Sequence, residues 1–294
     1  MKQDQIVMER SAPRSSKQEA RGSAIKTILF HVHGDAMLDA RLEAVLSIAR
    51  SFGAELRLVH VTPTDAYAVV DAFGVFVNLE IIEALDAEAA KLRTRLEARL
   101  ADENVEWTYE EVAGSLMPHL VHCASLADLL VIGREPKSPE FGGQVISLLG
   151  GLLDHVRTPL LVLGDEVVGL KPSGPAVVAW NGSHEAADAL RASVPLLKLL
   201  PGVVLLTVEE AKGGKTPGTQ ARDYLSRHGI DSRLVSRPRM GESIADDILA
   251  GAYAEDASCI VMGGYGHSRA GELLFGGVTR TLLKGCALPL LIAR

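Results

Sequence analysis

The chain has 294 residues, of which 47% are apolar and 23% charged, and its formal net charge at pH 7 is -7. This length allows two modest domains, and the absence of lysine- and arginine-rich runs argues against nucleic acid or an anionic membrane as the main partner. No apolar stretch reaches the roughly 20 residues that a membrane-spanning helix needs. Residues 1–24 are polar and lack the apolar centre of a secretory signal. We therefore expect a cytoplasmic protein whose residues 1–24 form a disordered tail.

The three cysteines, Cys123, Cys259 and Cys286, are widely spaced and lie in apolar sequence. A disulfide framework or a zinc site usually shows paired or closely spaced cysteines. We therefore expect reduced thiols in the protein core.

The first structural signals are a strand, a turn and a helix. Residues 26–35 form a β-rich run that ends in a turn, and apolar residues at helical spacing follow from Leu38 to Ala49. Residues 55–61 then predict a second strand. The apolar segment 67–79 is expected either to pack as a helix within the first domain or to form a lid or partner surface.

The second half of the chain repeats this order. Residues 176–183 predict a strand and a turn, 184–197 a helix and 203–208 a strand. The sequence at 127–133 (ADLLVIG) also matches ASCIVMG, 130 positions later, and the closing TPLLVL matches LPLLIA at the same separation. The repeat therefore extends without a gap through the later part of each half.

Glycines and prolines separate the two halves. We expect a first domain at 25–165, a linker at 166–175 and a second domain at 176–294. Apolar strands that alternate with helices predict an α/β fold with two tandem open parallel-sheet domains, each with helices on both faces.

A glycine-rich segment follows the apolar run 259–262 of the second half. Residues 263–280 read GGYGHSRAGELLFGGVTR, with six glycines in eighteen positions. Ligands of open parallel sheets bind beyond the carboxyl ends of the strands, near the switch point in strand order. Glycines there let backbone N–H groups approach phosphate oxygens, and a following helix N-terminus adds its dipole. We therefore expect a polyphosphate between the two glycine turns, which lie thirteen residues apart.

This spacing resembles that of the universal stress protein family, whose nucleotide-binding members carry G-x-x-G, nine residues, and then G-[S/T]. Gly263, Gly266 and Gly276 fit the pattern, whereas Gly277 replaces the serine or threonine. Either the nearby Thr279 hydroxyl takes its place, or the γ-phosphate loses a hydrogen bond. The resemblance extends from about residue 25 over nearly the whole chain, in the family's tandem two-domain form. It implies a Rossmann-like fold of the adenine nucleotide alpha hydrolase type, which binds ATP or another adenine nucleotide, with Mg²⁺ as its companion ion.

The resemblance also implies roles for individual residues of the second half. Ala179 and the Val208 backbone would flank the base, and Met262 would lie beneath the ribose. Asn181 replaces the family's usual aspartate near adenine and ribose, which keeps an acceptor, adds a donor and removes a charge. The nucleotide-binding residues implied in this way are Ala179, Trp180, Asn181, Val208, Met262, Gly263, Gly264, Tyr265, Gly266, His267, Arg269, Gly276, Gly277, Val278 and Thr279.

The first half departs from the family pattern. Pro136 falls where Gly266 is, and Ile146 falls where Gly276 is. Proline lacks an N–H donor and isoleucine blocks a close approach to the backbone. We therefore expect one nucleotide per chain, in the second domain.

Three other patterns have weaker functional interpretations. The GKT at 214–216 lacks the first glycine of a P-loop, which favours a flexible loop. His31, His33 and His60 would form a zinc site or a substituted ligand crevice, and we favour the crevice because no carboxylate has matching spacing. Four carboxylates are expected on a solvated helix face: Asp246, Asp247, Glu255 and Asp256.

The sequence contains no nucleophile paired with a base, no clear metal-ligand set and no synthetase-like motif, although His267 and Arg269 are placed to contact phosphates. We therefore expect a stress-response or signalling module that binds ATP and at most hydrolyses it slowly. The alternatives are a slow ATPase or nucleotide transferase, and a nucleotide-free interaction scaffold, for which Asn181 and Gly277 argue. The family resemblance further suggests a homodimer and a protein partner.

Overall fold

A computed structural model describes residues 6–10, 25–62, 68–71, 74–77, 79–134, 142–164, 169–209, 216–264 and 277–294. The strands are β1 (Ile6–Arg10), β2 (Thr27–His31), β3 (Glu55–Thr62), β4 (Ala68–Asp71), β5 (Gly74–Val77), β6 (Trp107–Ala113), β7 (Leu129–Gly133), β8 (Leu160–Leu163), β9 (Ala176–Ala179), β10 (Val203–Val208), β11 (Ser232–Arg237), β12 (Cys259–Gly263) and β13 (Leu290–Ala293). The helices are α1 (Leu38–Phe52), α2 (Leu79–Leu100), α3 (Leu116–Ala124), α4 (Gly142–His155), α5 (His184–Leu197), α6 (Gly218–Arg227), α7 (Ile244–Ala254) and α8 (Gly277–Gly285).

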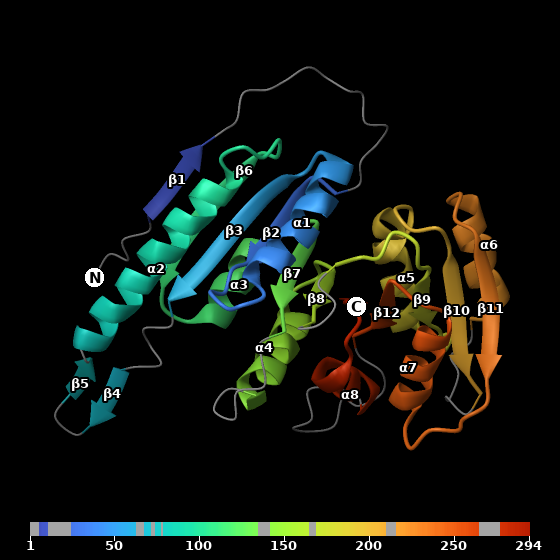
Figure 1. The fold of residues 1–294 in the computed structure, drawn as a ribbon. Helices are drawn as coiled ribbons and strands as arrows, with labels where there is room; N and C mark the ends of the chain where they lie inside the picture. Colours follow the sequence, from blue (N-terminus) through green and yellow to red (C-terminus); the bar gives the residue numbers. More distant parts are fainter. Residues whose placement is uncertain are drawn as a thin grey trace.

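One sheet of eleven strands runs through the whole molecule, in the order β1-β6-β3-β2-β7-β8-β13-β12-β9-β10-β11 (Figure 1). Strands β6, β3, β2, β7 and β8 of the first half are mutually parallel, and so are β11, β10, β9, β12 and β13 of the second half. The chain reverses its direction of travel across the sheet between β2 and β7, and again between β9 and β12. These two places are the switch points at which ligands of such sheets bind.

The two halves meet through an antiparallel pair of strands, β8 and β13. Leu161 lies opposite Leu291, Leu160 opposite Ile292, and Val162 opposite Leu290. Each of these β8 residues matches the β13 residue 130 positions later, so the register is symmetric about the Leu161–Leu291 pair. The predicted α/β fold, with parallel strands in each half and helices on both faces, is confirmed. The sequence did not predict that the two sheets join edge to edge, which satisfies backbone groups that two buried edge strands would otherwise leave without partners.

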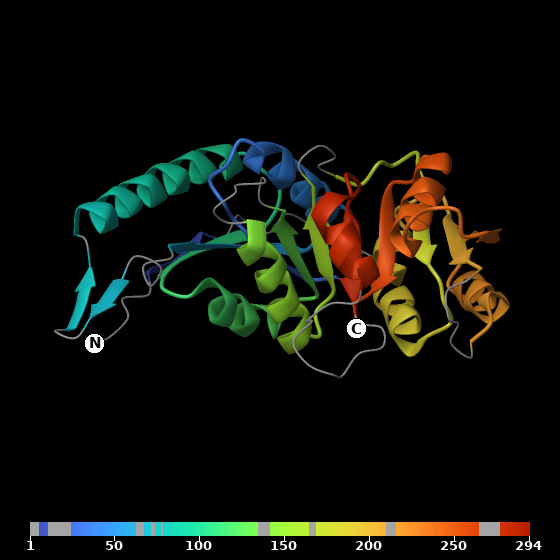
Figure 2. The same ribbon diagram turned by 90° about the horizontal axis from the view of Figure 1, so that it is seen from below.

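Helices cover both faces of the sheet (Figure 2). One apolar cluster packs α1, α2, α5 and α6 on the strands, and a second packs α3, α4, α7 and α8 on the opposite side chains of the same strands. The apolar positions predicted for the helix at 38–49 are buried, as are those predicted for 184–197. Each buried leucine contributes roughly 1.5–3 kcal/mol through removal of apolar surface from water.

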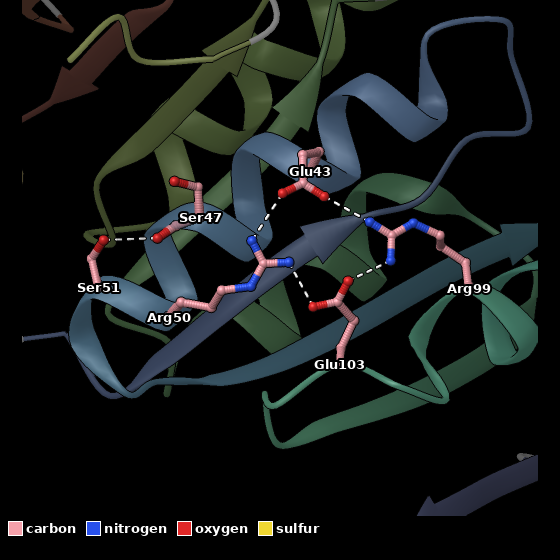
Figure 3. Close-up of polar contacts among 6 residues, drawn as sticks. All are labelled: Glu43, Ser47, Arg50, Ser51, Arg99 and Glu103. Carbon is pink, nitrogen blue, oxygen red and sulfur yellow. Dashed lines mark hydrogen bonds and ion pairs between the residues drawn. The ribbon is translucent and has the colours of Figure 1, made fainter. Parts of the chain in front are cut away.

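A closed ring of charges ties α1 to the end of α2 (Figure 3). Arg50 contacts Glu43 at 2.9 Å and Glu103 at 2.6 Å. Arg99 contacts the same two carboxylates, with 2.7 Å to Glu43. The two guanidinium groups hold the pKa of Glu103 below its ordinary value, through hydrogen bonds from Arg50 first and Arg99 second. The ring therefore fixes the segment that follows α2 against α1.

Two segments differ from their predictions. Residues 6–10, within the expected disordered tail, form β1 and pair antiparallel with β6, whose outer edge otherwise offers unpaired backbone groups. Ala68–Asp71 and Gly74–Val77 form a small antiparallel sheet of their own instead of a helix. Both views place that sheet beside the first turn of α2, away from the main sheet (Figures 1 and 2). Alternating β-branched and aromatic residues around a glycine favour such a hairpin.

Candidate functional site

The turn after β9 begins the candidate site at the switch point of the second half. The Asn181 side-chain oxygen accepts a hydrogen bond from the backbone N–H of Ser183 at 3.0 Å. Gly182 adopts φ +72°, a conformation that glycine enters without steric cost. The Ser183 hydroxyl accepts from Ala186 N at 3.2 Å and so caps α5. This local chemistry explains why the strand ends and the helix starts within a few residues.

The carboxyl end of β12 lies directly against the first turn of α5. A Cβ added to Gly263 would come within 2.7 Å of the backbone carbonyl carbon of Glu185. Only glycine therefore allows this close approach. Gly264 N donates to the Ala293 carbonyl at 2.8 Å, which aligns the chain beyond β12 with β13. The structure thus brings the end of β12 and the N-terminus of α5 together, as nucleotide binding at this place requires.

Four of the predicted site residues belong to one apolar surface of the second half. Val208 and Met262 are buried in the cluster that α7 and α8 cover, and Ala179 and Val278 pack against the same cluster while half-buried. Trp180 differs, because its side chain belongs to the cluster on the opposite face. Its indole N–H donates to the Thr216 carbonyl at 3.3 Å. Alternation of side chains along an extended chain separates Trp180 from Ala179.

The start of α8 carries the residues predicted to end the glycine loop. Gly277 is exposed, and a Cβ added there would meet no atom within 4 Å. Thr279 is only 4% exposed and shares the buried side of α8 with Leu282 and Leu283. Its hydroxyl therefore lies on the inner side of the helix, away from the exposed position at which the family pattern carries serine or threonine.

Several predicted residues lie outside the described ranges, so the structure says nothing of their positions. They are Tyr265, Gly266, His267, Arg269 and Gly276 of the glycine-rich segment, Lys215 of the GKT sequence, and Pro136 of the first half.

An arginine fills the corresponding place in the first half. The side chain of Arg41 is 2% exposed and forms an ion pair with Asp35 at 2.7 Å. Its second terminal nitrogen donates to the Arg134 carbonyl at 3.3 Å, beyond the end of β7. A Cβ on Gly133, which matches Gly263 in the repeat, would approach the guanidinium to 2.5 Å. The switch point of the first half is therefore occupied by a paired side chain of the protein itself.

The histidines of the first half do not converge on one point. His31 pairs in register with Val59, so neighbouring His60 projects from the opposite face of the sheet. Burial lowers the pKa of His31 to about 3, with smaller contributions from the charges of His33, His60 and Arg41. Burial also lowers the pKa of His60 to about 4, followed by the effect of His33. Both imidazoles are therefore neutral at pH 7, and the geometry does not fit a three-histidine zinc site.

The cysteines are free and buried, as predicted. Burial raises the pKa of the thiols to about 11 for Cys123, about 12 for Cys259 and about 11 for Cys286. Cys123 nevertheless lies beside His119 and Glu110, in the one group of potential metal ligands within the described residues. This group was not predicted from the sequence, in which the four-residue spacing of His119 and Cys123 within a helix is its one local signal.

The acidic residues near α7 have structural roles. Asp246 is exposed and forms a capping box with Ser243. Asp247 is only 5% exposed, so its prediction as a solvated side chain is wrong. Its Oδ1 accepts hydrogen bonds from Met240 N at 3.1 Å and Gly241 N at 2.8 Å, which fixes the connection from β11 to α7.

The helices in the described part of the chain include none long and apolar enough to span a membrane. The model of the universal stress protein family matches residues 24–164. No curated protein matches the chain.

Two solved structures share the fold over nearly the whole chain. A universal stress protein from Archaeoglobus fulgidus DSM 4304 is 16% identical, with a TM-score of 0.68 over 91% of this chain and 96% of that one. A protein assigned as a universal stress protein from Pseudomonas aeruginosa UCBPP-PA14 is also 16% identical, with a TM-score of 0.57 over 92% of this chain and 94% of that one. Residues 24–164 therefore form a domain of the universal stress protein family, and the chain as a whole shares the fold of these two structures.

Proposed function

We propose that this protein is a stress-response module that binds one adenine nucleotide, ATP by preference, at the carboxyl ends of β9 and β12. The observation that carries the proposal is the difference between the two switch points. In the second half, Gly263 lies against the backbone of Glu185 in the first turn of α5, whereas in the first half the buried guanidinium of Arg41 lies over Gly133. A polyphosphate requires backbone donors at this place, and in this proposal the N-terminus of α5 and the glycine-rich segment after β12 supply them in the second half.

The surroundings of Gly263 suit an adenine nucleotide. The half-buried Ala179 would offer its apolar side chain to the base and ribose, above the buried Val208 and Met262. The Asn181 amide oxygen is engaged in its turn, but its Nδ2 has no hydrogen-bond partner among the described residues and is free to donate to a ligand. The glycine-rich segment that follows β12 would then wrap the phosphates, with Mg²⁺ balancing part of their charge.

The ion pair between Arg41 and Asp35 argues against a second nucleotide in the first half. A nucleotide there would have to displace the guanidinium and leave the Asp35 carboxylate, whose side chain is 10% exposed, without its partner. Breaking a buried ion pair by removing one partner typically costs about 3–5 kcal/mol. We therefore propose that the first half has a structural or regulatory role and does not bind a nucleotide itself.

The groups named at the second switch point bind phosphates but do not activate water. Backbone amides and an asparagine amide stabilise charge without removing a proton. The function proposed is therefore that of a nucleotide sensor, in which occupancy alters partner choice, and any hydrolysis is slow.

Calorimetric titration of the full chain with ATP and Mg²⁺ tests this proposal. We expect one ATP per chain, and in Gly266→Val a loss of affinity of at least about tenfold, which is about 1.4 kcal/mol. The matched control is Gly285→Val at the far end of α8, where an added Cβ meets no atom within 4 Å. Two equivalent sites, or equal affinity in Gly266→Val and the wild type with intact circular dichroism spectra, would refute the proposed site. Absence of any adenine nucleotide binding would favour the scaffold alternative.

A further inference from the structure

Three side chains of the first half meet between β6 and α3, two elements that the proposed nucleotide site does not use. The Cys123 sulfur lies 3.3 Å from Nε2 of His119 and 3.7 Å from Oε2 of Glu110. Nε2 of His119 lies 3.4 Å from Oε1 of the same carboxylate. One ligand atom from each of the three residues therefore lies within 4.8 Å of the others.

These separations match the edges of a tetrahedron around a metal ion. Zinc binds sulfur at about 2.3 Å and imidazole nitrogen or carboxylate oxygen at about 2.0–2.2 Å, so tetrahedral ligand atoms stand about 3.4–3.6 Å apart. The sulfur–nitrogen distance of 3.3 Å is close to this range. The carboxylate lies 3.4 Å from His119 through Oε1 and 3.7 Å from Cys123 through Oε2, so a rotation of the Glu110 carboxylate would bring a single oxygen into place. An ion at the centre would need only small shifts of the side chains.

Secondary structure explains how the three residues meet. His119 and Cys123 are four residues apart in α3 and therefore share one helix face. Glu110 pairs in register with Val59, whose side chain lies in the apolar cluster that α3 covers. Strand alternation thus directs Glu110 toward α3.

The second half provides an internal comparison, because its equivalent positions carry no ligand. Glu110 is opposite Val59 in the same way that Val235 is opposite Leu206. Helices α3 and α7 end 130 positions apart, at Ala124 and Ala254, so His119 and Cys123 correspond to Leu249 and Tyr253. Val235 and Leu249 pack against the apolar core. The fold is therefore built with apolar residues at these places, and the polar set of the first half calls for another explanation.

We infer that Glu110, His119 and Cys123 form a binding site for a divalent transition metal ion, with Zn²⁺ the best fit. Thiolate, imidazole and carboxylate together suit zinc and exclude calcium and magnesium, which take oxygen ligands. Three protein ligands leave the fourth position for water or an exogenous ligand. The Glu110 and His119 side chains are each 16% exposed, so solvent reaches this position.

The charges of the site are compatible with an ion. One thiolate and one carboxylate balance the two positive charges of the ion, which leaves a neutral centre. The ion would join α3 to β6 and so link metal supply to the stability of the first half, by preferential binding to the folded state.

Cobalt substitution provides the direct test. The full chain is freed of metal with a chelator and titrated with Co²⁺ alone, followed by visible and near-ultraviolet absorption. We expect saturation at one equivalent, with the intense visible bands of tetrahedral cobalt and a near-ultraviolet band from thiolate-to-cobalt charge transfer. Added Zn²⁺ should displace the cobalt and abolish both signals. A wild-type protein without the charge-transfer band would overturn the inference.

Variants identify the ligands. We expect Cys123→Ser to lose the charge-transfer band, and His119→Gln and Glu110→Gln each to weaken Co²⁺ binding at least about tenfold. The control is His122→Gln, an exposed residue of the same helix outside the group. Zn²⁺ should raise the melting temperature of the wild type and of His122→Gln but not that of the other variants.

Two results would contradict this assignment: equal weakening by His122→Gln and His119→Gln, or a charge-transfer band that persists in Cys123→Ser. If Cys123→Ser does not fold, the two other ligand variants and the wild-type spectrum decide the question. Because the site does not involve the second half, loss of nucleotide binding and loss of metal binding are independent outcomes.

Discussion

Acid should destabilise this protein through one buried histidine of β2. His31 is 6% exposed, and its pKa is lowered from 6.5 to about 3, by burial first and then by the charges of His33, His60 and Arg41. The unfolded chain binds a proton near pH 6.5, whereas the folded chain resists it. The contribution of the neutral imidazole to stability is therefore complete above pH 6.5 and is lost as the pH falls toward 3.

The size of the effect follows from the width of this window. Each pH unit within it costs about 1.4 kcal/mol of unfolding free energy, so acidification to pH 4.5 removes about 2.7 kcal/mol through His31 alone. His31→Gln, which does not titrate, should lack this part of the loss. Other acid-sensitive groups, including His60 and Glu103, act equally on both proteins and cancel in the comparison.

Urea unfolding at several pH values between 7 and 4.5, followed by circular dichroism, measures the difference. The wild type and His31→Gln should diverge by about 1–3 kcal/mol at the acid end, once each is referred to its own stability at pH 7. His122→Gln, which removes an exposed imidazole that is not among the groups acting on His31, is the control. Parallel pH profiles for the wild type and His31→Gln would refute the assignment of a neutral buried imidazole.

Three further predictions concern the nucleotide site and the charge ring. Gly277→Ser should raise ATP affinity about tenfold, because an added Cβ there meets no atom within 4 Å and the hydroxyl restores a hydrogen-bond donor to phosphate. Gly277→Ala should show no gain, and so distinguishes the effect of the hydroxyl from that of greater helix stability. Glu103→Gln should cost about 1 kcal/mol in urea unfolding and lose much of that difference in 1 M salt, whereas Glu88→Gln, in a more exposed pair with Lys91, should change little. ATP turnover at saturation should stay far below one per second, against roughly 1 to 1,000 per second for typical enzymes; in single-turnover experiments, a faster rate that His267→Ala abolishes without loss of binding would identify an enzyme instead.

Local features of the fold were predictable from sequence because their causes are local. The buried face of α1 follows from apolar residues at helical spacing, and the cap of α5 follows from Asn181 and Ser183 directly after a strand. The β8–β13 joint was not predictable, since edge pairing depends on how two sheets approach each other. The separation of Trp180 from the other site residues depends on which face of the sheet each side chain points to just beyond β9.

The features of the site that were missed depend on contacts distant in sequence. Arg41 lies within an amphipathic helix, where an arginine ordinarily faces water; here it is buried because Gly133 leaves room for its guanidinium and Asp35 pairs with it. Glu110 is nine residues from His119, on another kind of element, so no single periodicity links the two. Such groups become visible only when strand register and helix placement are known.

The symmetric strand pair at the centre of the molecule has a consequence for the ratio of the two halves at different expression levels. Two separate chains that met through β8 and β13 would associate only above a threshold concentration, and they could exchange partners. A short connection between β8 and β9 instead keeps the two strand surfaces at an effective concentration on the order of millimolar, whatever the expression level. The half with the arginine-filled switch point and the half with the glycine-rich segment are therefore always present in equal numbers and always joined to each other. A cell that makes more of this protein changes how many such pairs it has but not their composition.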